Sequence, residues 1–277
     1  MRTACWVVIG LGLWVGAGSA ARPRNCALAL DGSGDYVTIP HSPALDFEGD
    51  DDFTVECWFQ TDEAARGNPP DCALVEKWGG REYRYPYVIR VHVNADRADY
   101  GTVEVASFDG SSRYPHLNSA RRGLNDGQWH HVAFVRHGTD YVRLYVDGKL
   151  EGELTAGLRG GRLGNTCPLC IGHHGDWPRS GPRDFVGLVD EVRVWKVPRS
   201  EEALVGNMNR RLTGREPGLV GYWDLNEGAG TVAHDRSGWG LDGQLVGNPQ
   251  WAAPGAPLGG RATHPNEQAL AAPRPET

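Results

Sequence analysis

The chain has 277 residues, of which 40% are hydrophobic and 23% charged, with a formal net charge of −7. This composition is typical of an ordinary globular protein. Nucleic-acid binding is disfavoured, because it depends on concentrated positive charge and the sequence has no run of Lys or Arg. The 38 Gly and 18 Pro favour many short strands joined by tight turns.

Residues 1–21 are predicted to be a cleaved secretory signal peptide. Arg2 precedes an apolar run over 5–18, and small residues follow at 18–21, where a signal peptidase would cut. The run is too short for a stable membrane span, which disfavours the alternative of an N-terminal anchor. We therefore expect a secreted protein, extracellular, or periplasmic if the source is bacterial, in an oxidising compartment.

Residues 25–195 have the pattern of successive strands. Apolar and polar side chains alternate over 53–59, and the segments 129–136, 141–146 and 187–195 alternate in the same way. Asp147-Gly148 separates two such runs and predicts a tight hairpin. These patterns predict an all-β fold, a two-sheet antiparallel sandwich or jelly roll.

The segment after residue 195 predicts one helix, a further set of strands and a tail. Ser200 is a suitable N-cap, with acidic residues in the first turn, and the helix is expected to extend to Arg210 and Arg211. Residues 218–251 return to strand and turn. Residues 252–277 are rich in proline and poor in large apolar groups, so a disordered tail is predicted.

Six segments together resemble the laminin G-like, pentraxin-related domains of the concanavalin A-like lectin/glucanase superfamily. They are ALALDGSGDYVTIP (27–40), FTVECWF (53–59), GQWHHVAFVR (127–136), VRLYVDGKL (142–150), PLCIG (168–172) and GLVDEVRVWKVPRSEEAL (187–204). The resemblance implies one jelly-roll domain over residues 22–251, usually a secreted binding or spacer module and often calcium-bound. Segments like 218–251 commonly open such a domain, so here we expect this segment to complete the sandwich in permuted order.

Catalysis is the first alternative to a binding role, because some members of the superfamily are glycosidases. Retaining hydrolysis needs two carboxyl groups about 5–5.5 Å apart. Asp190 and Glu191 are neighbours on a predicted strand, so they should point to opposite faces and present no such pair. The sequence therefore favours a non-catalytic module for an extracellular carbohydrate or protein. The alternatives are a glycan-cleaving enzyme on the same fold and a purely structural matrix or adhesion component.

The cysteines of the mature chain suggest disulfides. Cys57 and Cys72 would close a loop of roughly fifteen residues and stabilise the fold by about 3 kcal/mol, the alternative being two reduced core thiols. Cys167 and Cys170 could join each other, or one of them could join Cys26. Zinc binding by Cys167, Cys170, His173 and His174 is disfavoured, because the crowding of these four groups makes tetrahedral closure difficult.

Two loop regions, 79–87 and 173–183, combine aromatic rings with arginines and turn residues. Rings stack against the C–H faces of sugars, so these regions are the predicted ligand-binding surface, with core or edge packing as the alternative role of each ring. The candidate ligand-binding residues are Trp78, Tyr83, Tyr85, Tyr87, His173, His174 and Trp177.

A calcium site is the last candidate. Alternation places Asp190 on the core-facing side with Leu188, Val192 and Val194, where its charge requires compensation. Asp31 and Asp35 lie in a glycine-rich turn whose carbonyl groups would suit calcium, and the resemblance implies that their strand runs beside that of Asp190. The alternative is that Asp190 accepts backbone N–H groups or pairs with Arg193 or Arg199, and that Asp31 and Asp35 stabilise a turn.

Overall fold

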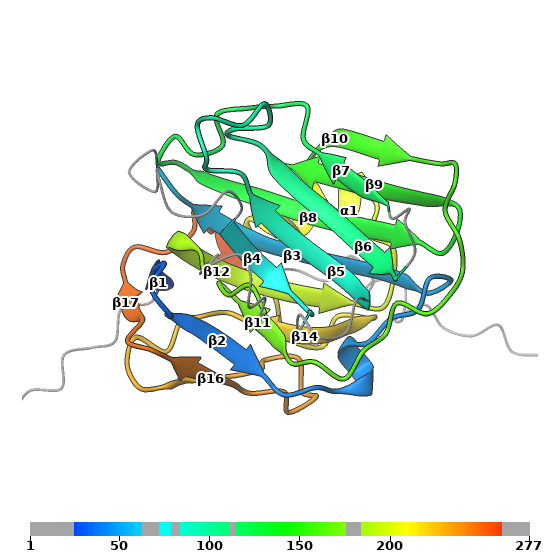
Figure 1. Cartoon of the computed structure of the whole chain (residues 1–277). Coiled ribbons are helices and arrows are strands. Elements are labelled where there is room, and N and C mark those ends of the chain that lie inside the picture. Colours follow the sequence, from blue (N-terminus) through cyan, green and yellow to red (C-terminus); the bar gives the residue numbers. More distant parts are fainter. Residues whose placement is uncertain (1–24, 63–71, 79–83, 111–114, 176–183, 262–277) are drawn as a thin grey trace, which may run out of the picture.

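The computed structural model describes residues 25–62, 72–78, 84–110, 115–175 and 184–261. Two antiparallel sheets, a back sheet and a front sheet, stack face to face (Figure 1). The described strands of the back sheet are, in order, β10 (Lys149–Leu154), β9 (Tyr141–Val146), β8 (Trp129–His137), β3 (Asp52–Gln60), β12 (Val186–Trp195), β1 (Ala27–Asp31) and β17 (Gln250–Ala252), and β14 (Leu219–Trp223) also pairs with β12. The predicted all-β jelly-roll sandwich is confirmed.

The front sheet lies nearer the viewer in Figure 1. Its described strands are, in order, β15 (Val232–Ala233), β16 (Gly243–Val246), β2 (Tyr36–Ile39), β11 (Leu169–Ile171), β4 (Cys72–Glu76), β5 (Arg84–Val91), β6 (Val103–Asp109) and β7 (His116–Asn118). The short 3-10 helix η1 (Pro43–Leu45) follows β2.

The main core fills the space between the sheets, as the alternation along β3 predicts. Phe53 and Phe59 point inward, and Phe53 meets Phe134 of β8 edge to face with ring centroids 5.2 Å apart. The outer face of β3 is buried as well: Trp58 donates its indole N–H to the carbonyl oxygen of Met208 at 2.8 Å. The strand β3 is therefore covered on both faces.

The predicted hairpin and helix are both present. Asp147 and Gly148 have φ of 50° and 75°, the left-handed pair that a two-residue hairpin turn requires. Helix α1 (Glu201–Met208) begins after Ser200, whose hydroxyl accepts the backbone N–H of Ala203. The helix is shorter than predicted, because residues 210–211 form the strand β13 (Arg210–Arg211) instead of a last turn.

A β-bulge in β12 contradicts the predicted alternation around Asp190. Glu191 has φ of 52°, and the register with β3 shifts between Asp190 and Arg193. Val192 faces the core, whereas Asp190 lies opposite Trp58 on the outer face. An extra residue in one strand reverses the faces of all residues beyond it, so the prediction that Asp190 and Val192 share a face is wrong.

The carboxyl-terminal segment adds strands to both sheets. β14 pairs with β12, β16 pairs with β2, and β17 pairs with β1. Beyond β17, Ala256 is fully buried, and β18 (Gly260–Arg261) pairs in parallel with β13. The prediction of a disordered tail from residue 252 is therefore wrong for 252–261, which backbone hydrogen bonds hold on the domain.

Two predictions fall on residues outside the described ranges: the signal peptide, 1–21, and the rest of the tail, 262–277. Within the described ranges, no helix has the length and apolar character needed to span a membrane.

Candidate functional site

The outer face of the front sheet carries a row of aromatic rings. Phe108 of β6 lies 5.8 Å from Tyr85 of β5, Tyr85 lies 5.7 Å from Trp78 after β4, and Trp78 lies 4.6 Å from the imidazole of His174 after β11, all between ring centroids. Trp78 and Phe108 are half-buried, whereas Tyr85 and His174 are nearly covered. We call these four residues the ring row.

A buried carboxylate lies beside the ring row. Glu76 is 0% exposed, and its carboxylate accepts hydrogen bonds from Arg90 and from His174 Nδ1, each at 3.1 Å. The Arg90 guanidinium carbon lies 5.7 Å from the centroid of the Trp78 ring. Burial alone would raise the pKa of Glu76, but the charges and hydrogen bonds of Arg90 and His174 lower it, so this carboxylate is ionised.

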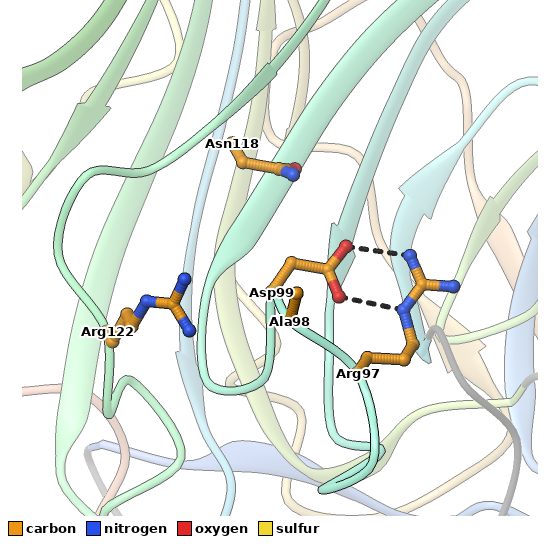
Figure 2. A pocket seen from close by; sticks show the side chains of 5 residues that line it. All are labelled: Arg97, Ala98, Asp99, Asn118 and Arg122. Carbon is orange, nitrogen blue, oxygen red and sulfur yellow. Dashed lines mark hydrogen bonds and ion pairs between the residues drawn. The ribbon is translucent and has the colours of Figure 1, made fainter.

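A pocket opens farther along the same face. Its volume is about 460 Å³, and it is lined by Arg97, Ala98, Asp99, Asn118 and Arg122 (Figure 2). Glu104, the cross-strand partner of Arg90, is also the partner of Asn118 on β7. Directly opposed residues point to the same side of a sheet, so Asn118 shares a face with Arg90 and the ring row.

Asp99 is the fixed anionic wall of this pocket. Arg97 donates to its two carboxylate oxygens at 2.8 and 2.7 Å, and His92 Nε2 lies 3.5 Å from Oδ2. The hydrogen bonds from Arg97 lower the pKa of Asp99 to about 2, and the charge of a protonated His92 acts in the same direction. This carboxylate is therefore ionised and oriented.

The structure separates the predicted ligand-binding residues. It brings Trp78, Tyr85 and His174 together in the ring row. His173 lies apart from them, stacked on Tyr36 at 4.2 Å and hydrogen-bonded to Asp184. Tyr83 and Trp177 lie outside the described residues.

The structure corrects the prediction for Tyr87. It is fully buried in the core, and its hydroxyl donates to the carbonyl oxygen of Leu45 at 3.0 Å. A register shift between Tyr85 and Val88 turns Tyr87 inward while Tyr85 stays on the outer face. The prediction that Tyr87 contacts ligand is therefore wrong.

The three predicted calcium ligands do not converge. β1 does run beside β12, but Asp31 lies opposite Val186, four residues from Asp190, which is about 13 Å along a strand. Each carboxylate instead accepts a backbone N–H: Asp31 that of Ser33, Asp35 that of Asn248, and Asp190 those of Glu191 and Ala256. Within the described ranges, no three His, Cys, Asp or Glu side chains are grouped to hold a metal.

The predicted disulfides are absent. Cys57 and Cys170 carry free thiols, so neither the Cys57–Cys72 bridge nor a bridge within 167–170 is formed. Cys57 and Cys72 belong to opposite sheets, which stack about 10 Å apart, farther than the roughly 4.4–6.8 Å between Cα atoms that a disulfide needs. Burial raises the pKa of both free thiols, to about 12 for Cys170, so they are protonated.

The family of the chain follows from its sequence. Residues 31–204, more than half of the chain, match a laminin G model described as the concanavalin A-like lectin/glucanases superfamily. The chain belongs to this superfamily. No curated protein matches it.

Solved structures are similar to this concanavalin A-like domain. A candidate carbohydrate-binding protein from Bacteroides ovatus has a TM-score of 0.64 at 21% identity, over 85% of this chain and 61% of that one. A pentraxin from Limulus polyphemus has a TM-score of 0.48 at 16% identity, over 66% and 81%. Mouse laminin α1 domains LG4-5 have a TM-score of 0.47 at 13% identity, over 66% and 48%. The chain thus spans about three fifths of the Bacteroides protein.

Sequence reasoning missed the polar half of this concanavalin A-like site. Glu76, Arg90 and the pocket residues at 97–99, 118 and 122 were not among the candidates. One signal was available: in 88–93 the polar Arg90 and His92 alternate with apolar residues, and the charged turn NADRAD follows directly. That pattern predicts polar groups gathered on one face at the end of a hairpin.

Proposed function

We propose that the protein is a secreted, non-catalytic module that binds an extracellular carbohydrate on the outer face of the front sheet. The observation that carries the proposal is the ring row lying on the same face as the pocket. Aromatic rings supply stacking surfaces for sugar C–H groups, and the pocket supplies fixed polar groups. The Bacteroides ovatus protein, itself a candidate carbohydrate-binding protein, has the same fold and supports this role.

The pocket has the size and chemistry of a sugar subsite. Its volume of about 460 Å³ falls within the range of roughly 300–1,000 Å³ common for small-ligand sites. The Asp99 carboxylate can accept hydrogen bonds from two hydroxyl groups, and the Asn118 amide can both donate and accept. One sugar ring in the pocket would leave neighbouring rings to extend along the sheet face towards Trp78.

The carboxylates of the domain support binding without hydrolysis. A glycosidase needs a carboxylic acid with a raised pKa within reach of substrate. Glu76, beside the ring row, has a lowered pKa and is fully buried. Asp190, Glu191 and Glu227 do have raised pKa values, chiefly because of burial, but they are at most 5% exposed and bonded to groups of the domain itself.

The test combines a glycan array with a hydrolysis assay. We expect wild-type protein to retain a glycan without releasing reducing ends. Trp78→Ala should weaken retention several-fold, with partial recovery in Trp78→Phe, because a ring restores the stacking surface. Trp239→Ala, which removes an exposed Trp outside the site, is the control and should bind normally. Release of products would show an enzyme, and normal retention by Trp78→Ala would place the ligand elsewhere.

Calcium dependence stays a prediction from the sequence. If calcium binds, metal at a hundred times its dissociation constant should raise the free energy of unfolding by about 2.7 kcal/mol. The melting temperature is measured with chelator and with millimolar calcium, for wild type and Asp31→Ala. Identical melting temperatures under both conditions would remove the metal from the proposal without affecting carbohydrate binding.

A further inference from the structure

The walls of the pocket differ in how their charges are compensated. On one wall, Arg97 and Asp99 form a two-point ion pair, with both bonds drawn in Figure 2. On the opposite side, Arg122 is exposed, and no hydrogen bond or ion pair joins its guanidinium to another described side chain. In the view of Figure 2, Asn118 lies above Arg122 and Asp99. The guanidinium N–H groups of Arg122 are thus available to donate hydrogen bonds to a ligand.

The formal charges of the pocket lining favour an anion. Two arginines and one aspartate line it, which gives a formal charge of +1 on a chain whose overall charge is −7. The pair formed by Arg97 and Asp99 is neutral, so the excess resides on Arg122. A densely charged polyanion would be repelled by the acidic chain as a whole, whereas a single anionic group could contact Arg122 directly.

We propose that this pocket binds a sugar residue that carries a carboxylate, a unit of the uronic-acid type. Arg122 would take the carboxylate in a two-point fork, the geometry for which guanidinium is suited. The Asp99 carboxylate would accept hydroxyl protons from the same ring, and the Asn118 amide would hold a further hydroxyl or the ring oxygen. This inference rests on the proposed function and specifies its ligand class.

The experiment compares ligands that differ only in charge. Isothermal titration uses trigalacturonic acid and its methyl ester, which keeps the hydroxyl groups and loses the negative charges. A trisaccharide without carboxylates that carries a sulfate group serves as a third probe. We expect the acid to bind at least about tenfold more tightly than the ester, as a charge-assisted hydrogen bond implies. Arg122→Gln should remove this preference, so that the acid and the ester bind with similar affinities. Arg162→Gln, which replaces an exposed arginine outside the pocket, should keep the preference.

Several results would overturn the inference. Equal affinities for acid and ester, or an unchanged preference in Arg122→Gln, would show that Arg122 in the pocket does not select a charged ligand over a neutral one. Preference for the sulfated probe over the acid would assign a different anion. If neither trisaccharide binds while neutral glycans are retained on the array, the acidic ligand is wrong and the proposed function stands. If no glycan binds, both this inference and the proposed carbohydrate-binding function are wrong.

Discussion

At the scale of single residues, buried charged groups cluster on the outer face of β3. Glu56 on the outer face of β3 is 1% exposed; its carboxylate accepts the Trp195 indole N–H at 2.8 Å and lies 3.0 Å from His131 and 3.8 Å from Arg193. Burial alone would raise the pKa of Glu56, but the hydrogen bond with His131 and the charge of Arg193 overcome this and hold it at about 2.

Replacing Glu56 should therefore destabilise the fold strongly and in a pH-dependent manner. Glu56→Gln should lower the free energy of unfolding by about 3 kcal/mol at neutral pH. This is the low end for a broken buried ion pair, because Arg193 keeps its ion pair with Glu191. Because the pKa of Glu56 is lower in the folded state, its ionisation stabilises the fold at pH values above the unfolded-state pKa of about 4.3. This contribution is lost as the pH falls towards the folded-state pKa. Urea unfolding at pH 7 and pH 3 should show a smaller difference from wild type at pH 3. Asp140→Asn, at a carboxylate 74% exposed, should change stability little.

His130 should show the opposite pH dependence. Burial alone would lower its pKa, but Asp147 at 2.9 Å and Asp126 at 3.2 Å raise it. Because the pKa of His130 is higher in the folded state, its protonation stabilises the fold at pH values below the unfolded-state pKa of about 6.5. This contribution is lost as the pH rises through the folded-state pKa. His130→Gln should therefore destabilise more at pH 5.5 than at pH 8.5 in urea unfolding, with exposed His41→Gln as the control. Equal losses at both pH values would contradict this assignment.

At the scale of elements, the sequence predicted what depends on local alternation. The strands β3, β8 and β9 and the turn at Asp147 follow from period two and from turn chemistry, both readable within ten residues. The face of a residue beyond an irregularity is not readable in this way. The bulge at Glu191 made the predicted face of Asp190 wrong, and the register shift after Tyr85 made the predicted exposure of Tyr87 wrong.

The candidate site was only half predictable for a related reason. The aromatic residues Trp78, Tyr85 and His174 were visible as residue types. Their common environment was not, because it joins segments distant in the chain: His174 meets Glu76 across 98 positions. The pocket arises likewise from the pairing of β6 with β7 and the turns around them. Such contacts depend on tertiary register, which a single sequence does not specify.

The carboxyl-terminal strands should be indispensable to the fold. Ending the chain after Thr213 removes β14 and β17, together with core residues such as Trp223, and leaves one side of β12 and β1 without a partner. We expect this truncated chain to lack a cooperative thermal transition by circular dichroism. The control ends after Arg261 and keeps every described strand, so it should melt like the full chain. A folded product ending at Thr213 would show that the remaining strands form a sufficient core.

At the scale of the whole molecule, the sequence predicts that residues 1–21 direct export of the chain. The apolar run at 5–18 lies outside the described residues, and export is its predicted function. Expression in a host with a secretory pathway should yield a mature protein that begins at Arg22, as shown by N-terminal sequencing of the medium or periplasm. A chain starting at residue 22 should stay inside the cell. A secreted product that keeps residues 1–21 would contradict cleavage.

The two ends of the described chain meet at one point of the domain. Arg211 donates to Asn25 at 3.2 Å, and the same Arg211 is the register partner of Arg261 in β18. Ala27 and Ala252 likewise face each other across β1 and β17. Tension applied through both ends would therefore load these short terminal pairings first. We expect them to open one residue pair at a time before the front sheet, which carries the ring row and the pocket, is loaded. In a pulling experiment the domain should yield by a small, low-force extension before its main rupture, and it should keep its ligand through that first step.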